Sequence, residues 1–324
     1  MMIRYVYGPH WNRLVGSYTV IVDTIGFPKK CVYDCIYCSI GPTNTKAIQP
    51  VSLVPPDNII ADLKWLLNRV NKDFNTILFY GTGDPWLNPW FPLIVEKTRD
   101  IVRELGLDVE LHVVSTGHLL SKQWAVQALK SIDRIYIKID GLGEDYSLIN
   151  NPHPEAKMKN LIETLKNIRG IMGSDRIFYE VTLLEYEGFS NANMGSLDQI
   201  SAFLSMVKAE NVVIRTVHRL PRVASVKPVS KKKYEMARDF LEDKGFKVHL
   251  EHNIMKPYGG SIDFDEVMLY NHLLRKPLTM KEIMMSYKLS VGAVAGFLNS
   301  LERKGLVAKI PWRTQVYYKG VWKK

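Results

Sequence analysis

The sequence predicts an α/β protein whose strands alternate with helices and form a parallel sheet, followed by a small C-terminal unit. Two observations lead to this expectation. Apolar, β-branched runs of strand length recur between segments of helical periodicity, and this alternation stops near Ser230. Strands and helices in such an order form right-handed crossovers with the helices outside the sheet. The length of 324 residues allows one large domain and a small appendage.

The alternating region contains six predicted strands, at Tyr18–Thr24, Thr76–Tyr80, Val109–Val114, Arg134–Ile139, Ile177–Leu184 and Val212–Val217. Between them, helical periodicity predicts helices near 57–71, 91–105, 121–131, 157–169 and 197–209. Parallel α/β folds carry their chemistry at the carboxyl ends of the strands. We therefore expect the functional residues just after these runs.

Beyond Ser230 the pattern changes to short elements. The sequence predicts a helix at Lys231–Lys244, a strand at Phe246–Glu251 and a linker at Pro257–Gly260. Helices are then expected at Phe264–Leu274, Met280–Tyr287 and Val291–Lys304, the last between a Ser290 N-cap and Gly305. Strands at Val307–Ile310 and Gln315–Tyr318 follow, around a tip at Pro311–Arg313. This order resembles a winged helix-turn-helix. The expected domains are 1–230, the 231–261 extension and linker, and the 262–324 winged helix.

Composition excludes several classes of protein. Hydrophobic residues make up 46% and charged residues 23%, as in globular domains. The apolar runs are shorter than a membrane helix requires, and the N-terminus lacks the apolar core of a secretory signal, so we expect a cytoplasmic protein with no membrane contact. The net charge is +10, and residues 262–324 hold 11 basic against 5 acidic residues. Nucleic acid, with RNA ahead of DNA, is one expected partner of this segment; protein docking or structural support are the others.

All three cysteines lie in one short segment, Cys31, Cys35 and Cys38, with C-x3-C-x2-C spacing. An odd number of thiols cannot all pair as disulfides. A closed zinc site needs four ligands, and the nearest histidine, His10, is 21 residues upstream of the first cysteine. Three thiolates on a four-iron cluster would leave one iron open for a substrate or cofactor. The spacing therefore favours an iron–sulfur centre.

With Tyr37 before the last cysteine, this motif resembles the signature of the radical S-adenosylmethionine (SAM) superfamily. The resemblance implies a partial (β/α)6 barrel, a [4Fe-4S] cluster bound by the three cysteines, and SAM bound at the open iron. It also implies one-electron cleavage of SAM to a 5′-deoxyadenosyl radical, which removes a hydrogen atom from the substrate. The protein then binds the cofactor, positions the substrate and excludes water.

The residues that follow the strands fit this resemblance. The turn Gly81, Thr82, Gly83 and Asp84 resembles the glycine-rich segment that contacts the methionine amino group of SAM, and Ser115 and Thr116 occupy the place of ribose or carboxylate contacts. Lys138, Asp140 and Arg215 lie at the ends of later strands and are the expected catalytic residues, as cofactor or substrate contacts inside the barrel. A satisfied ion pair between Lys138 and Asp140, and a solvated rim at Arg215, are the structural alternatives.

Several segments are similar to one branch of the superfamily, the wyosine-synthase-like enzymes that modify a guanosine beside a tRNA anticodon. They are the lead-in from Tyr7 to Gly16, the turn Gly81–Pro85, and the stretch from Asp140 to Asn150–Pro154. Archaeal wyosine synthases carry further cysteines for a second cluster, and no cysteine is left for one here. We therefore expect a one-cluster relative with a different reaction.

The sequence thus predicts a radical SAM enzyme that modifies RNA, with tRNA as the leading substrate, and that takes electrons from a donor such as ferredoxin or flavodoxin. Two rival functions remain. One is a non-catalytic iron–sulfur regulator that binds DNA through the winged helix and senses redox state. The other is a radical SAM enzyme whose substrate is a protein or a small molecule.

Overall fold

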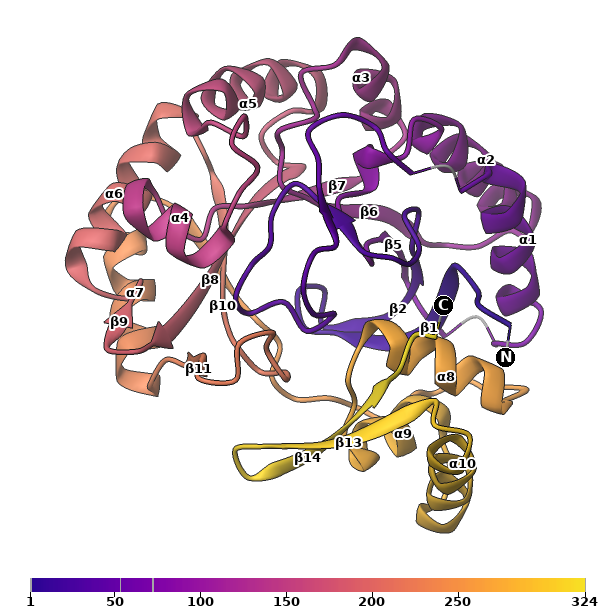
Figure 1. Cartoon of the computed structure of the whole chain (residues 1–324). Coiled ribbons are helices and arrows are strands. Elements are labelled where there is room, and N and C mark those ends of the chain that lie inside the picture. The colour runs from indigo at the N-terminus through magenta and orange to yellow at the C-terminus, as the bar shows by residue number, and fades with distance from the viewer. Residues whose placement is uncertain (1, 53, 72, 324) are drawn as a thin grey trace.

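A curled, half-barrel sheet forms the body of the protein. The computed structural model describes residues 2–52, 54–71 and 73–323 (Figure 1). Eight strands form the main path of the sheet, in the order β1-β2-β5-β6-β7-β8-β10-β12. They are β1 (Val6–Asn12), β2 (Ser17–Val22), β5 (Thr76–Phe79), β6 (Glu110–Ser115), β7 (Arg134–Lys138), β8 (Ile177–Tyr186), β10 (Asn211–Thr216) and β12 (Lys247–Leu250).

The six strands expected from the sequence are all present and pair in parallel, from β2 through β10. The outer helices lie around the convex side of the sheet (Figure 1). They are α1 (Pro56–Leu67), α2 (Phe91–Glu104), α3 (Gln123–Lys130), α5 (Met158–Met172), α6 (Met194–Met206) and α7 (Lys231–Asp243). Their apolar faces are buried against the sheet, which explains the helical periodicity of the sequence.

The structure adds elements at both edges of the sheet that the alternation did not predict. β1 pairs antiparallel with β2, so the chain enters as a hairpin. At the other edge β12, the strand expected at Phe246–Glu251 outside the barrel, pairs in parallel with β10. The alternating sheet therefore continues beyond Ser230.

Short elements complete the barrel. β3 (Lys30–Cys31) pairs with β4 (Thr45–Lys46) within the cysteine loop, and the 3-10 helix η1 (Pro85–Leu87) follows the glycine-rich turn. β9 (Phe189–Ser190) and β11 (Lys227–Pro228) both pair with the end of β8. The helix α4 (Gly143–Asn150) was not predicted from the sequence. Asn151, which follows it, has the left-handed backbone conformation and ends the helix.

The C-terminal segment consists of α8 (Glu266–Arg275), α9 (Met280–Tyr287), α10 (Val291–Arg303) and the hairpin β13 (Val307–Trp312) and β14 (Gln315–Gly320). Pro311 and Trp312 belong to β13, so the expected tip at Pro311–Arg313 was placed too early. An isolated antiparallel bridge between Leu278 and Tyr318 attaches the connection after α8 to the hairpin. The segment lies across the gap between the two edges of the sheet (Figure 1).

Buried polar contacts attach this segment to the barrel. Arg275 at the end of α8 and Asp23 after β2 form an ion pair of 2.7 Å, and neither side chain is exposed. His272 of α8 lies 3.0 Å from the Nδ1 atom of His10 on β1 and 2.7 Å from the Tyr287 hydroxyl. Because such groups cost free energy when buried without partners, these contacts favour one fixed position of the segment.

Within the described residues, no helix is both long enough and apolar enough to span a membrane.

Candidate functional site

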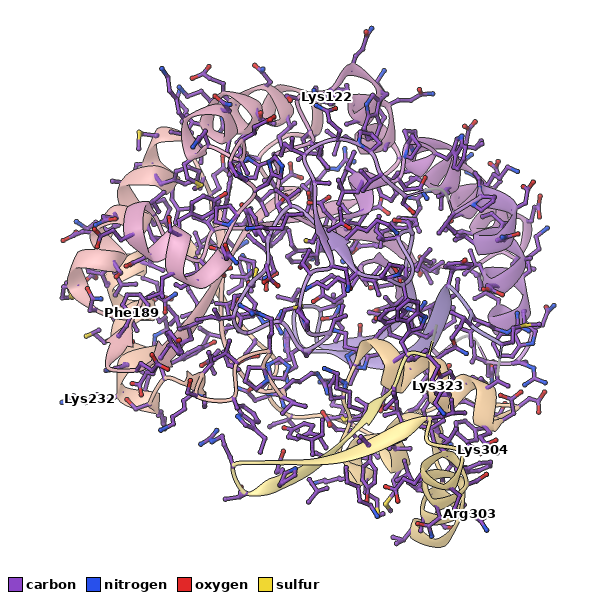
Figure 2. All side chains as sticks on the ribbon, viewed as in Figure 1. Lys122, Phe189, Lys232, Arg303, Lys304 and Lys323 are labelled. Atoms are coloured by element: carbon purple, nitrogen blue, oxygen red, sulfur yellow. The ribbon has the colours of Figure 1, made fainter. Side chains whose placement is uncertain are left out.

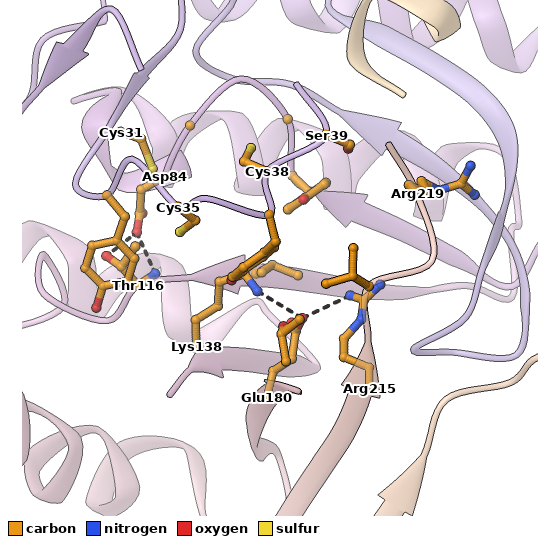
Figure 3. A pocket seen from close by; sticks show the side chains of 18 of the residues that line it. Cys31, Cys35, Cys38, Ser39, Asp84, Thr116, Lys138, Glu180, Arg215 and Arg219 are labelled. Atoms are coloured by element: carbon orange, nitrogen blue, oxygen red, sulfur yellow. Dashed lines mark hydrogen bonds and ion pairs between the residues drawn. The ribbon is translucent and has the colours of Figure 1, made fainter. Parts of the chain in front are cut away.

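A cavity lies at the carboxyl ends of the barrel strands, beneath the loop that carries the cysteines. It encloses about 930 Å³, counting its open mouth. Figure 3 shows the three thiols at one side of the cavity and the Lys138, Glu180 and Arg215 side chains opposite them. Eleven of the thirteen residues predicted from the sequence line it: Cys31, Cys35, Tyr37, Cys38, Gly81, Gly83, Asp84, Ser115, Thr116, Lys138 and Arg215. Thr82 and Asp140 do not.

The cysteine loop follows β2 and is attached to the end of α4. The Asp34 and Ile36 amides donate to the carbonyls of Asn150 and Ile149, at 2.9 and 3.0 Å. The Asn150 side-chain amide lies 3.5 Å from the Cys35 sulfur. The unpredicted helix α4 therefore positions the middle cysteine.

A buried lysine lies beside the thiols. The Lys29 ammonium is 3.2 Å from the Cys38 sulfur and donates to the Gly41 carbonyl at 2.8 Å. Burial raises the pKa of the Cys31 thiol to about 11 and that of Cys35 to about 12. Burial acts in the same direction at Cys38, but Lys29 and the backbone hydrogen bonds of Ile40 and Gly41 together outweigh it and lower the pKa of that thiol. The loop thus offers three sulfurs, one buried and two half-buried, and one compensating cation.

This donor set fits an iron–sulfur cluster better than a single metal ion. Among residues 2–52, 54–71 and 73–323, no three His, Cys, Asp or Glu side chains converge closely enough to hold one ion. Cluster ligands need not converge in that way, because each thiolate binds a different iron. Iron replaces the thiol protons whose loss burial otherwise opposes, so three cysteines with a nearby lysine suit a cluster with one open iron.

The glycine-rich turn packs against the cysteine loop. A Cβ atom at Gly83 would lie only 1.6 Å from the Lys30 carbonyl oxygen, so no larger residue fits. The Thr82 hydroxyl, predicted to contact the cofactor, instead contacts the Asp23 carboxylate at 2.8 and 2.9 Å and the Gly26 carbonyl at 2.9 Å. Thr82 therefore holds the glycine-rich turn in place from the side away from the cavity.

Asp84 joins the turn to the end of β6. Its Oδ2 atom accepts hydrogen bonds from the Ser115 hydroxyl at 3.0 Å and from the Thr116 amide and hydroxyl, both at 2.7 Å. Among the described residues, its Oδ1 atom accepts a hydrogen bond from the Trp86 amide alone, at 3.2 Å. Burial raises the pKa of Asp84, and these hydrogen bonds oppose the shift. One acceptor position on Oδ1 remains for a cofactor donor such as an ammonium group.

Asp140 lies behind the cavity wall. Its Oδ2 atom accepts from the Tyr37 hydroxyl at 2.5 Å and from Asn150 at 2.8 Å, and its Oδ1 atom accepts from the Thr182 amide at 2.8 Å. The structural alternative, an ion pair between Asp140 and Lys138, is not found among the ion pairs of the described residues. Asp140 instead supports Tyr37, which does line the cavity.

The partner of Lys138 is Glu180 on the next strand. Glu180 lies opposite Lys138 in the register of β7 and β8, and its Oε1 atom accepts from Lys138 at 3.0 Å and from Arg215 at 2.9 Å. Burial favours the neutral acid, but Lys138 and Arg215 outweigh it and lower the pKa of Glu180 to about 2. Lys138, Glu180 and Arg215 thus form a triad of paired charges on one wall of the cavity.

Two buried polar atoms of the cavity wall have no partner among the described residues: the Glu180 Oε2 atom and the Thr182 hydroxyl. Unpaired buried polar atoms cost free energy unless a ligand or water meets them. Their position on the cavity wall indicates a polar ligand.

Sequence reasoning missed several lining residues, among them Lys29, Glu180, Thr182 and Lys276. Glu180 had a visible signal, since it is the one charge within the apolar run Ile177–Leu184. Lys276 had none, because it reaches the cavity from the C-terminal segment.

The comparisons with known proteins agree with this geometry. The family model described as the Radical SAM superfamily matches residues 25–188, which include the cysteine loop, the glycine-rich turn and strands β5–β8. Among curated proteins, the chain is 26% identical over 305 residues to GTPase Obg of Brachyspira hyodysenteriae, covering 93% of this chain and 43% of that protein. It is 22% identical over 224 residues to a UPF0026 protein of Methanocaldococcus jannaschii, covering 68% and 66%. The chain thus spans less than two thirds of the length of either relative.

Two solved structures share the fold. A radical SAM methyltransferase from Sphaerobacter thermophilus superposes with a TM-score of 0.52 at 15% identity, covering 72% of this chain and 66% of that one. Native anSMEcpe with bound AdoMet superposes with a TM-score of 0.51 at 14% identity, covering 71% and 63%. At these identities the likeness concerns the fold alone.

Proposed function

The chain belongs to the radical SAM superfamily, and from that premise we propose that it is an RNA-modifying enzyme with a single cluster and that tRNA is its substrate. Membership makes the chain an enzyme and gives it the cofactors of the superfamily, a [4Fe-4S] cluster and SAM. The single cluster, the RNA substrate and an electron donor such as ferredoxin or flavodoxin are our proposals. The sequence similarity to the tRNA-modifying branch supports the choice of substrate.

Cys31, Cys35 and Cys38 would bind three irons of the cluster, and Lys29 would compensate the negative charge of the thiolates. When bound, the reduced cluster and SAM supply a 5′-deoxyadenosyl radical that can remove a hydrogen atom from a substrate. The protein contributes a cavity that is walled by buried and half-buried side chains, with the cysteine loop on one side. Exclusion of water limits side reactions in such chemistry.

The glycine-rich turn would hold the methionine end of SAM. Gly81 and Gly83 allow the cofactor to approach the backbone, and the remaining acceptor position of Asp84 can receive an ammonium proton. Ser115 and Thr116 are fixed by Asp84 at the neighbouring strand end, where they can contact a ribose or carboxylate. Tyr37 lines the cavity near Lys138, whose ammonium lies 5.0 Å from the centre of its ring.

Lys138 and Arg215 would line the substrate end. Both already contact Glu180, so their positions are set before any ligand binds. Such preorganisation lowers the cost of orienting a substrate. We assign the catalytic role to this pair together with Glu180, and a supporting role to Asp140.

The observation that carries the RNA proposal is a groove that continues from the cavity to the tip of the C-terminal hairpin. It encloses about 1110 Å³ and shares Thr216, Val217 and His218 with the cavity wall. Its other lining residues include three cations and three aromatic rings beside the Glu251 carboxylate: Arg13, Lys231, Arg313, Tyr234, Trp312 and Tyr317. Cations that follow a phosphate backbone beside rings that stack on bases are typical of sites for single-stranded nucleic acid.

We propose that residues 262–324 are a winged helix that presents this groove, after a 1–230 barrel and a 231–261 connection. Three helices, a hairpin and the bridge from Leu278 to Tyr318 support that assignment. Arg303 ends α10, Lys304 follows it, and the Lys323 ammonium donates to the Lys304 carbonyl at 3.0 Å; all three add positive charge to the segment (Figure 2).

The test is an anaerobic reaction of the reconstituted protein, SAM and a reductant with tRNA from cells that lack the enzyme. We expect a nucleoside of changed mass in the tRNA, and faster formation of 5′-deoxyadenosine than without RNA. Arg313→Ala should weaken RNA binding by about 3- to 10-fold because one phosphate contact is lost. Lys159→Ala, at an exposed position on α5, is the matched control.

Unchanged RNA would contradict the proposal, above all if a protein or small-molecule fraction from the same cells accelerates SAM cleavage instead.

A further inference from the structure

Lys276 reaches the cavity from outside the barrel. It follows α8 in the C-terminal segment, and its ammonium lies 4.5 Å from the centre of the Tyr80 ring, at the end of β5. Lys276 lines the main cavity and also a second one of about 390 Å³, whose wall includes Lys138, Glu180 and Arg215. The segment that closes the barrel therefore also contributes a side chain to the candidate site.

The other cations of the cavity wall have polar partners. Lys29 donates to the Gly41 carbonyl, and Lys138 and Arg215 contact Glu180. Arg219 forms an ion pair with Glu282 at 3.0 Å and donates to the Pro277 carbonyl at 3.1 Å. In the part of the chain that the structure describes, the Lys276 ammonium has neither a hydrogen bond nor an ion pair.

The surroundings of Lys276 are electrostatically unfavourable without a ligand. Burial lowers the pKa of Lys276 well below its ordinary value, and Arg219 and Arg215 lower it further. A half-buried amine near two guanidinium groups is stabilised when an anion joins it. The Tyr80 ring provides only a partial substitute.

This cationic group lies at the opposite end of the cavity from the predicted methionine-binding groups. Figure 3 shows Asp84 and Thr116 beside Cys31, with Arg215 and Arg219 across the cavity. An anion at the arginine end is therefore more consistent with the substrate than with the carboxylate of SAM.

We propose that Lys276, with Arg219 beside it, binds an anionic oxygen group of the substrate, either a phosphate or a carboxylate. This inference rests on the proposed function, in which the cavity holds both SAM and the substrate. It makes the C-terminal segment a part of the active site and a determinant of specificity.

The experiment measures anion binding to the cluster-loaded, SAM-saturated protein by anaerobic calorimetry, with inorganic phosphate and acetate as separate probes. Lys276→Met keeps the length of the side chain and removes its charge, whereas Lys276→Arg keeps the charge. Lys159→Met is the control at an exposed, distant lysine. The affinity for SAM and the rate of substrate-free 5′-deoxyadenosine formation are measured for each variant.

We expect the wild type to bind at least one probe and Lys276→Met to bind it about 10-fold more weakly, the effect of one lost charge-assisted hydrogen bond. Lys276→Arg should stay within about 3-fold of wild type, and the affinity for SAM should not change in any variant. Preference for phosphate would identify a phosphate group of the substrate, and preference for acetate a carboxylate.

Equal anion binding by wild type and Lys276→Met overturns the inference, as does binding of neither probe by the wild type. Loss of SAM affinity in Lys276→Met would reassign the lysine to the cofactor. Failure of the wild type to form 5′-deoxyadenosine would instead count against the proposed function, because anion binding is measured independently of turnover.

Discussion

Glu180 is the residue on which the charges of the candidate site depend. Its side chain is 1% exposed and one of its oxygens accepts from both Lys138 and Arg215. When one member of a buried ionic group is removed, the remaining charges lose their partner. The resulting loss of stability is larger than the stability that the intact group adds over apolar residues in the same place. The triad therefore acts as one unit in stability and in positioning.

Glu180→Gln should lower the free energy of unfolding by about 3–5 kcal/mol, because two buried cations lose their carboxylate. Denaturant unfolding monitored by circular dichroism measures it. Glu163→Gln, which breaks an exposed pair with Lys166, should cost less than about 0.5 kcal/mol. Equal small effects of the two substitutions would show that the triad is not electrostatically coupled.

Gly83 has a comparable role in the geometry of the site, since a Cβ atom there would meet the Lys30 carbonyl oxygen beside Cys31. Gly83→Ala should therefore displace the cysteine loop and reduce the iron bound per chain after reconstitution by at least about half, with a loss of stability of about 1–3 kcal/mol. Gly170→Ala in α5, where the added atom meets nothing within 4 Å, is the control. Full iron loading of Gly83→Ala would contradict the close packing of the two loops.

At the scale of elements, the C-terminal segment and the barrel meet through the buried pair of Asp23 and Arg275. Asp23 also accepts from the Thr82 amide and hydroxyl, so the same carboxylate holds α8 and the glycine-rich turn. A displacement of α8 can thus move the glycine-rich turn, at the cofactor end of the cavity, through the Asp23 side chain.

Arg275→Met should destabilise the protein by about 3–5 kcal/mol, because Asp23 is left buried and unpaired. The double variant Asp23→Asn with Arg275→Met should recover part of that loss, since no isolated charge remains. Unfolding free energies of the four proteins give the coupling energy. A coupling near zero would show that this ion pair does not help to hold the two elements together.

The sequence predicted these elements better than it predicted their contacts. The sequence pattern located the six parallel strands and the C-terminal helices, because the apolar runs of strands and the helical periodicity of helices both reflect which side chains are buried. It did not reveal that Lys138 meets Glu180 rather than Asp140, since the strand register decides this and register is a property of the assembled sheet. Lys276 was missed for a related reason: its neighbours come from strands far away in the sequence.

For the whole molecule, the junction of the segment and the barrel should respond to acid. Burial lowers the pKa of His10 and of His272 well below the ordinary value, with further contributions from Lys276 and Arg219. The folded state keeps both rings neutral, whereas the unfolded chain takes up protons below about pH 6.5. Their contribution to stability is therefore complete above that pH and is lost as the pH falls.

The melting temperature should accordingly decrease between pH 7 and pH 5, and the decrease should be smaller in His272→Gln than in wild type. Differential scanning fluorimetry on samples with equal iron content measures this difference. Parallel pH profiles of the two proteins would rule out a titration of the buried histidines.

Radical SAM catalysis by this chain requires that the three cysteines and the adjoining cavity bind a cluster and SAM in a catalytic arrangement. Anaerobic reconstitution, reduction and incubation with SAM test it most directly, with chromatography for 5′-deoxyadenosine and methionine and with Cys35→Ala alongside. We predict both products from the wild type and a loss of at least about 100-fold in the variant. A wild-type protein that takes up its cluster but forms no 5′-deoxyadenosine, even with cellular RNA and extract present, would contradict the account and favour a non-catalytic iron–sulfur protein.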